Sequence, residues 1–385
     1  MKCLKCGEEN NNDAGRCFKC NTPLLWTPES DTKEFGKIKI SKLAIIAISL
    51  SIISLVLYLI CPILEENFIL SNSDLHNLAF VSLGISILGI ILGIFSLLLI
   101  EVSGGKIKGL GFSIGAILIP IFAMVILFTS AITKGRKQVA FQTACRVNLQ
   151  SLGRAMLAYA NDYNTELPRA GDTTTVWGTS VIYDAMTRNT EYGMASDGTG
   201  GEATISSSLY LLVKYSYVSP KFFICNGDYG KGVNQYRPTA NQNLRNLWDF
   251  GSEPWKHVSY AYHMPYGTTA LTTSSNPGMA VAADRNPWIP SGWGAKNFAK
   301  FNTGNNATLF ENGNSPSHNS EGQNVLFVDG RVSFSRYSIC GISNDNIYTS
   351  WNGRDITKGT VPTVGSQPAG LRDSLLVNDP PATNR

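Results

Sequence analysis

The pattern of apolar and polar positions divides the chain into unlike parts. Three uncharged runs, residues 43–64, 77–100 and 109–133, lie within one apolar stretch, and the residues before and after it are mainly polar. A helix of about 20 apolar residues crosses the hydrocarbon core of a bilayer. We therefore expect three transmembrane helices within residues 43–133, because burying three such helices inside a soluble fold would need a much larger protein around them.

A helical pattern follows the third run almost at once. Apolar side chains recur at steps of four and three in Cys145, Leu149, Leu152, Met156, Tyr159 and Tyr163. These positions share one face of a helix. The stripe predicts an amphipathic helix whose apolar face is buried, with Arg146, Gln150 and Arg154 accessible. The alternative is a helix that lies flat among lipid headgroups.

Strand signals appear farther along the chain. In "GQNVLFVDGRVSF", residues 322–334, apolar side chains flank Asp329-Gly330, a pair typical of a type I′ turn. This segment predicts a buried β-hairpin. We expect an α+β domain with an antiparallel sheet over residues 134–340. Residues 341–385 form a C-terminal extension that packs on this domain or trails from it.

Length and charge narrow the classes of function. The 385 residues suffice for two or three folding units. A net charge of +4 is too small to indicate nucleic acid, so no nucleic-acid partner is expected. The predicted spans contain no Asp, Glu, Lys, Arg or His, which argues against a transporter. The first 40 residues contain no apolar segment typical of a secretory signal, so we expect uncleaved internal anchors.

The flanking charges predict the orientation. Before the first run lie Lys33, Lys37, Lys39 and Lys42, and between the second and third runs lie Lys106 and Lys108. The first connection has no Lys or Arg. By the positive-inside rule the N-terminus is cytoplasmic and the C-terminal domain extracytoplasmic, in a multi-pass protein of the cytoplasmic (inner) membrane. Lys134, Arg136 and Lys137 favour the opposite orientation.

The cysteines of the first segment have metal-ligand spacing. Cys3-x2-Cys6 is followed, ten residues later, by Cys17-x2-Cys20. Two such pairs supply four thiolates to one tetrahedral ion, and a segment with so few apolar residues needs the metal to fold. We expect a structural Zn²⁺ in a zinc ribbon over residues 1–25, then a linker over 26–42. A pair of disulfides is the alternative, which a cytoplasmic location disfavours.

Three cysteines fall in the expected exterior domain: Cys145, Cys225 and Cys340. If that side of the membrane is oxidising, two of them can form a disulfide, with Cys145 and Cys225 as candidates. Spacing alone does not choose among the three possible pairs.

Five dispersed stretches resemble type IV pilins and the pseudopilins of bacterial type II secretion. They are "ACRVNLQSLGRAMLAYANDYNTELP", "SSLYLLVKYSYVSPKFFICNGD", "VSYAYHMPYG" with "MAVAADRNPW", "NSPSHNSEGQNVLFVDGRVSF" and "DNIYTSW…DSLLVND". The resemblance implies a long helix packed on a sheet, a second helix followed by a Cys-bearing strand, and a Cys145–Cys225 pair. His318, Asp329 and Gly330 fall at the family's prepilin-type His-x9-Asp-Gly element. Residues 77–133 resemble a small membrane module of unknown function that accompanies bacterial zinc ribbons.

The chain departs from this family in two ways. Ten residues rather than nine separate His318 from Asp329. The prepilin peptidase signature is also missing, because Gly111-Phe112 is not followed by a Glu at the fifth position. We therefore do not expect processing or assembly into a filament.

Enzymatic motifs do not appear in the sequence. Candidate residues for a hydrolase are His318, Asp329, Asp284, His257 and His263, but none lies in a recognisable motif. We expect Asp329 and Asp284 to be turn residues and His318 a hydrogen-bonded loop residue. Calcium among Asp197, Asp228, Asp284 and Asp329 is an option that the family suggests, but the ligand spacing of an EF-hand is missing.

Three hypotheses about function follow. The leading one is a non-enzymatic, membrane-anchored, pseudopilin-like protein with a role in secretion, surface assembly or envelope organisation. Its partners would be the lipid bilayer and other envelope or secretion proteins. The second is a signalling or adaptor protein whose cytoplasmic zinc ribbon binds a partner, and the third is a membrane-anchored hydrolase.

Overall fold

The computed structural model divides into two compact units, Met1–Ile132 and Thr133–Arg385. It describes residues 1–11, 14–24, 39–66, 72–104, 107–179, 182–228, 232–290, 294–302 and 310–381. Most of the expected linker, residues 26–42, lies outside the described part. Each unit is described by itself below.

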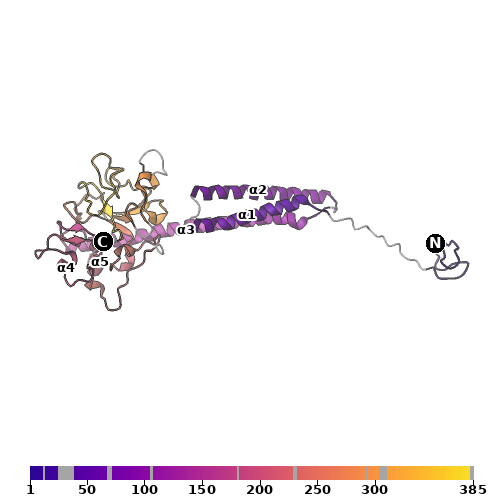
Figure 1. The fold of residues 1–385 in the computed structure, drawn as a ribbon, viewed down its shortest axis with the longest axis horizontal. Coiled ribbons are helices and arrows are strands. Elements are labelled where there is room, and N and C mark those ends of the chain that lie inside the picture. Colours follow the sequence, from indigo (N-terminus) through magenta and orange to yellow (C-terminus); the bar gives the residue numbers. More distant parts are fainter. Residues whose placement is uncertain are drawn as a thin grey trace. The chain divides into compact units, whose positions relative to one another are not determined.

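Long apolar helices dominate the first unit. Helix α1 is Lys42–Glu66, α2 is Asn72–Val102, and α3, Leu110–Asp162, begins in this unit. Helices α1 and α2 lie side by side (Figure 1). Short strands β1 (Lys39–Ile40) and β2 (Ile107–Lys108) pair in parallel.

Two of these helices are long and apolar enough to cross a membrane, over Lys42–Ile60 and Phe80–Val102. These segments overlap most of the first and second predicted spans, residues 43–64 and 77–100. The apolar part of α3 that the structure describes, Leu110–Ile126, is shorter. The third span therefore stays a prediction.

Small and polar side chains lie between these helices, while large apolar ones face outward. The Ser51 hydroxyl donates to the Ala116 carbonyl oxygen at 2.8 Å, which ties α1 to α3. A Cβ added at Gly93 of α2 would lie 3.2 Å from the Ser113 carbonyl oxygen of α3. Phe80, Phe112, Leu118 and many similar residues are exposed, whereas six serines of these helices are buried. This distribution is the reverse of that in a water-soluble bundle.

The second unit contains a five-stranded antiparallel sheet with the order β8-β7-β6-β5-β9. The strands are β5 (Tyr260–His263), β6 (Ala280–Asp284), β7 (Gln323–Phe327), β8 (Val332–Ser335) and β9 (Leu376–Val377). A register shift between Ala280 and Ala282 interrupts the pairing of β6 with β7. Separately, β3 (Val176–Trp177) pairs in parallel with β4 (Glu202–Ala203).

The C-terminal half of α3 packs on one face of this sheet. Leu149, Leu152 and Met156 are buried in one cluster with sheet residues such as Tyr262 and Leu326. Helix α5 (Ile205–Lys214) contributes to the same cluster, whereas the short α4 (Arg188–Tyr192) ends at a left-handed Gly193. The expected packing of the amphipathic stripe on a sheet is therefore confirmed.

The two faces of the helix differ as its pattern predicts. Arg146 and Arg154 are exposed and Gln150 is half-buried. The stripe weakens at its end, since Tyr163 is exposed but stacks on Tyr159 with ring centroids 4.1 Å apart.

The other face of the sheet is also covered. Val325 and Phe327 of β7 pack with Ile347 and Tyr348 of the C-terminal region and with Trp288. Because both faces are buried, every residue of β5, β6 and β7 is buried. The region after residue 340 supplies an edge strand, since Val377 of β9 pairs with Tyr262. It therefore packs on the domain as part of its sheet.

Two local predictions were wrong. The expected strand before Cys225 is a 3₁₀ helix, Pro220–Phe223, because Pro220 at its first position has a fixed φ suited to a helical turn and no N–H to give to a sheet. The hairpin is present, but its turn is not type I′. Gly330 has φ +81° while Asp329 is outside the left-handed region, and the Gly330 N–H donates to the Phe327 carbonyl. That arrangement is a three-residue hairpin loop, in which a type I turn is followed by a left-handed glycine.

Truncation of the helix face tests the packing. Leu152→Ala should lower the free energy of unfolding by about 2–5 kcal/mol, the range for a fully buried leucine. The matched control Arg154→Ala, on the exposed face, should change it by no more than about 0.5 kcal/mol. Tryptophan fluorescence during denaturant unfolding of the chain in detergent measures both. Equal midpoints for Leu152→Ala and the parent would show that the stripe does not stabilise the domain.

Candidate functional site

The two Cys-x2-Cys turns of the first segment have the same backbone geometry. The Gly7 N–H donates to the Cys3 carbonyl at 2.9 Å, and the Asn21 N–H donates to the Cys17 carbonyl at 2.8 Å. Gly7 and Asn21 both have positive φ, +75° and +54°. Glycine and asparagine adopt this conformation most readily. Gly7 and Asn21 therefore allow each Cys-x2-Cys turn to close.

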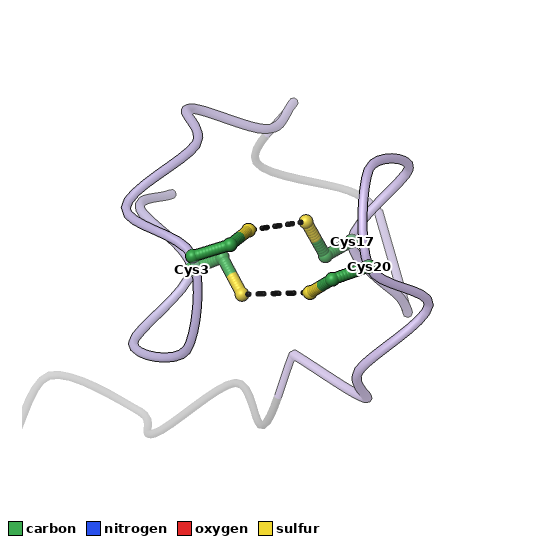
Figure 2. Close-up of side chains that lie close together, drawn as sticks. Cys3, Cys17 and Cys20 are labelled. Atoms are coloured by element: carbon green, nitrogen blue, oxygen red, sulfur yellow. Dashed lines mark hydrogen bonds between the residues drawn. The ribbon is translucent and has the colours of Figure 1, made fainter.

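The four sulfur atoms converge. Figure 2 shows the side chains of Cys3, Cys17 and Cys20 pointing into the space between the two turns. The Cys3 and Cys20 Sγ atoms are 3.6 Å apart, those of Cys6 and Cys17 are 3.5 Å apart, and all four lie within 4.8 Å of one another. Four thiolates on one Zn²⁺ lie about 3.8 Å apart, because each Zn–S bond is about 2.3 Å long. The cluster could therefore hold a metal ion, and these distances fit zinc.

The local electrostatics favour thiolates but not four of them without a cation. Hydrogen bonds from Thr22 lower the pKa of the Cys20 thiol to about 6. At Cys6 a backbone hydrogen bond with Glu8 lowers the pKa, but the neighbouring thiols and burial outweigh it and raise the pKa to about 12. Like charges this close disfavour ionisation of one another. A divalent cation removes that conflict.

Asn10 holds the two turns together and was not foreseen from the sequence. Its side-chain N–H donates to the Cys17 Sγ at 3.5 Å, and its Oδ1 accepts from the Phe18 N–H at 3.0 Å. It is 6% exposed. Its position between the two cysteine pairs was the available signal, since buried polar residues near a metal site usually orient its ligands.

In the second unit, Cys145 and Cys225 form a disulfide with a Cα–Cα distance of 5.0 Å. It joins the head of the amphipathic part of α3 to the segment after the 3₁₀ helix. The Asn148 side chain reinforces this connection by donating to the Ile224 carbonyl at 2.8 Å. Closing a loop of 80 residues stabilises the fold by about 4.5 kcal/mol in the chain-entropy model.

A histidine and a carboxylate lie against this disulfide. The His318 Nε2 is 3.6 Å from the Cys225 Sγ and 3.1 Å from the Asp284 Oδ2. The Asn324 backbone N–H donates to the same Oδ2 at 2.6 Å. All of these side chains are buried. Asp284 was expected to be a turn residue, and this was wrong, because the end of β6 points its carboxylate into the domain.

The surrounding contacts fix this cluster and shift its protonation. Burial lowers the pKa of His318, but the charge of Asp284 and a hydrogen bond to it outweigh burial, so the pKa is raised. Burial also raises the pKa of Asp228, although Arg285 and Ser317 lower it in part. A Cβ at Gly227 would lie 2.0 Å from the Ser317 carbonyl oxygen, so only glycine allows this close approach.

The remaining candidate residues lie apart from this cluster. Asp329 is at the hairpin turn, where its Oδ1 accepts from the Arg331 N–H at 3.0 Å, so the structure does not join it to His318 as one site. The His257 Nδ1 is 2.9 Å from the Asn234 carbonyl oxygen, and burial lowers the pKa of His263 to about 4. Asp197 closes a turn with Thr199.

The proposed calcium ligands therefore do not form one group. Among the described residues, only two sets of at least three Cys, His, Asp or Glu side chains converge. These sets are the four cysteines of the first segment and Cys145, Cys225, Asp284 and His318.

Comparison of the chain with protein-family models, curated proteins and solved structures finds no match in any of the three.

Metal binding by the first segment can be measured directly. A peptide of residues 1–25 should bind one Zn²⁺ and release protons as its thiols ionise. Cys17→Ser should weaken binding by orders of magnitude because one of four ligands is lost. The control is Leu4→Ser, a fully exposed position in the first turn, which should leave the affinity unchanged. Calorimetry in two buffers gives affinity and proton release, and an unaltered affinity in Cys17→Ser would exclude that thiol as a ligand.

Proposed function

We propose that this protein is a non-enzymatic membrane anchor that presents a pilin-like α+β domain outside the cytoplasmic membrane, with a zinc ribbon on the cytoplasmic side. Its role would lie in secretion, surface assembly or envelope organisation, with the bilayer and other envelope proteins as partners. The observation that carries the proposal is the reversed polarity of the first unit, with apolar side chains outside and serines between the helices.

The reversed polarity supports a three-helix anchor. In lipid no hydrophobic effect drives apolar side chains into the space between helices, so membrane helices associate through small residues and interhelical hydrogen bonds. The close approach at Gly93 and the Ser51 hydrogen bond are contacts of this kind. The beginning of α3 takes part in both, which supports its assignment as the third span. A water-soluble protein would expose such an apolar surface only at an interface.

The helix packed on the sheet supports the pilin-like part of the proposal. Helix α3 continues from its apolar beginning to Asp162 as one element, and its later part carries the buried stripe. This order along the helix, lipid-facing first and sheet-packed afterwards, is what the resemblance to pseudopilins implies. The missing peptidase signature favours a permanent anchor over a filament subunit.

The burial of the polar cluster supports a non-enzymatic role. His318 and Asp284 form the only histidine–carboxylate ion pair among the residues that the structure describes, and both side chains are 0% exposed. A general base must lie within hydrogen-bonding reach of its substrate. Here the disulfide, the sheet and the loop around Ser317 occupy that space.

Protease access tests the proposed topology. In cells with an opened envelope and an intact inner membrane, added protease should remove residues 134–385 and spare the ribbon. A cytoplasmic marker protein controls for leakage. Digestion of residues 1–40 with survival of the C-terminal domain would contradict the proposal.

Reversing the charge of the lysines before the first span tests the proposed orientation a second time. Lys37→Glu, Lys39→Glu and Lys42→Glu together should increase the fraction of inverted chains, because lysines close to a span set its orientation. Lys2→Glu with Lys5→Glu, far from the first span, is the matched control and should have no such effect.

A further inference from the structure

Four potential metal ligands of three chemical kinds meet in the interior of the second unit. They are the Sγ atoms of Cys145 and Cys225, a carboxylate oxygen of Asp284 and a ring nitrogen of His318, all within 4.8 Å of one another. Cys145 lies in α3 and Cys225 in the segment after Pro220–Phe223. Asp284 ends β6, and His318 lies in the 3₁₀ turn Pro316–His318. All four residues are 0% exposed. The fold therefore concentrates these groups at one point from four separate elements.

The distances fit the edges of a tetrahedron around one metal ion. With Zn–S bonds of about 2.3 Å and Zn–N or Zn–O bonds of about 2.0 Å, a sulfur–nitrogen edge is about 3.5 Å and a nitrogen–oxygen edge about 3.3 Å. The Cys225 Sγ to His318 Nε2 distance is 3.6 Å, and the His318 Nε2 to Asp284 Oδ2 distance is 3.1 Å. The two sulfurs, bonded to each other in the disulfide, must separate to reach the sulfur–sulfur edge of about 3.8 Å.

Two buried polar atoms distinguish this cluster from a fully hydrogen-bonded one. The Asp284 Oδ1 and the His318 Nδ1 are buried and have no hydrogen-bond partner among the described residues. Buried polar atoms are almost always paired, and an unpaired one calls for an explanation such as an ion or a water. An ion bound through the Asp284 carboxylate would account for the unpaired Oδ1, because either oxygen can be the ligand, whereas the His318 Nδ1 stays unpaired when Nε2 binds the ion.

Neighbouring contacts hold the ligands in place without a metal. Asn324 lies against both ligands, with its side-chain nitrogen 3.3 Å from the Asp284 Oδ2 and 3.3 Å from the His318 Nε2. The Ser317 hydroxyl donates to the Asp228 Oδ2 at 3.1 Å, which joins the His318 turn to the Cys225 segment. Contacts of this kind orient metal ligands and are the part of a site that chance clusters lack.

We infer that Cys145, Cys225, Asp284 and His318 form a second tetrahedral zinc site whenever the two cysteines are reduced, so that the same residues carry either a disulfide or a metal ion. A dithiol supplies the two electrons: it becomes a cyclic disulfide, the Cys145–Cys225 bond breaks, and each cysteine takes one proton. Zn²⁺ then displaces both thiol protons and binds two thiolates, the His318 nitrogen and the Asp284 carboxylate. Two thiolates with one nitrogen and one oxygen suit Zn²⁺ better than Mg²⁺ or Ca²⁺.

Zinc counting on the full chain tests this assignment. The chain is synthesised into detergent micelles with Zn²⁺, either under a dithiol reductant so that the disulfide never forms or under oxidising conditions. We expect two Zn²⁺ per reduced chain and one per oxidised chain. With Cys3, Cys6, Cys17 and Cys20 all changed to Ser, the expected numbers are one and zero. No zinc in the reduced, ribbon-free chain would overturn the inference.

Variants then separate ligands from bystanders in the ribbon-free chain. His318→Gln and the double change Cys145→Ser with Cys225→Ser should each abolish the reduced-state zinc, whereas Cys340→Ser, a cysteine outside the cluster, should retain it. The oxidised His318→Gln chain keeps its disulfide and serves as the folded control. Co²⁺ in place of Zn²⁺ should give the ligand-field absorption of a tetrahedral site with thiolate ligands. An octahedral spectrum, or full zinc retention in His318→Gln, would refute the site.

Discussion

The packing of α3 on one face of the five-stranded sheet is the interaction on which the second unit depends. The side chains of Leu149, Leu152 and Met156 are buried there with Leu326 of β7, an interior strand of the sheet. At Gly153 an added Cβ would lie 2.8 Å from a Leu326 methyl group, so the helix backbone comes very close to that strand. Deletion of the helix would expose this face of the sheet, and its other face is already covered by the region after residue 340.

The buried cysteine–histidine cluster follows from that packing. Once α3 lies on the sheet, its residue Cys145 faces the end of β6, where Asp284 turns inward, and the turn that carries His318 closes over both. Whether these residues hold a disulfide or a metal, they join the helix to three other elements. The four thiols of the first segment also converge, and because so small a segment has no apolar core, a metal ion bound by them would supply its order.

The sequence predicted features that repeat at a fixed spacing. The helical stripe, the apolar runs and the paired Cys-x2-Cys turns each follow from local geometry, and the structure contains all three. It did not predict features that depend on distant residues. Asp284 resembled a turn residue because its environment is supplied by His318 and Asn324, which lie far along the chain. Asn10 was missed although the signal was local, since it lies between the two cysteine pairs, and Pro220 favoured a helical turn where apolar neighbours indicated a strand.

Hydrogen exchange along α3 tests the central claim most directly. Amides that open only by global unfolding share one free energy of exchange, whereas elements that open alone have a lower one. If the helix is the spine of the domain, the amides of residues 145–160 should exchange with the same free energy as those of β6 and β7, and lose protection together with them in denaturant. Free exchange of residues 145–160 while the sheet stays protected would show a helix that belongs to the membrane surface instead, and would contradict this account.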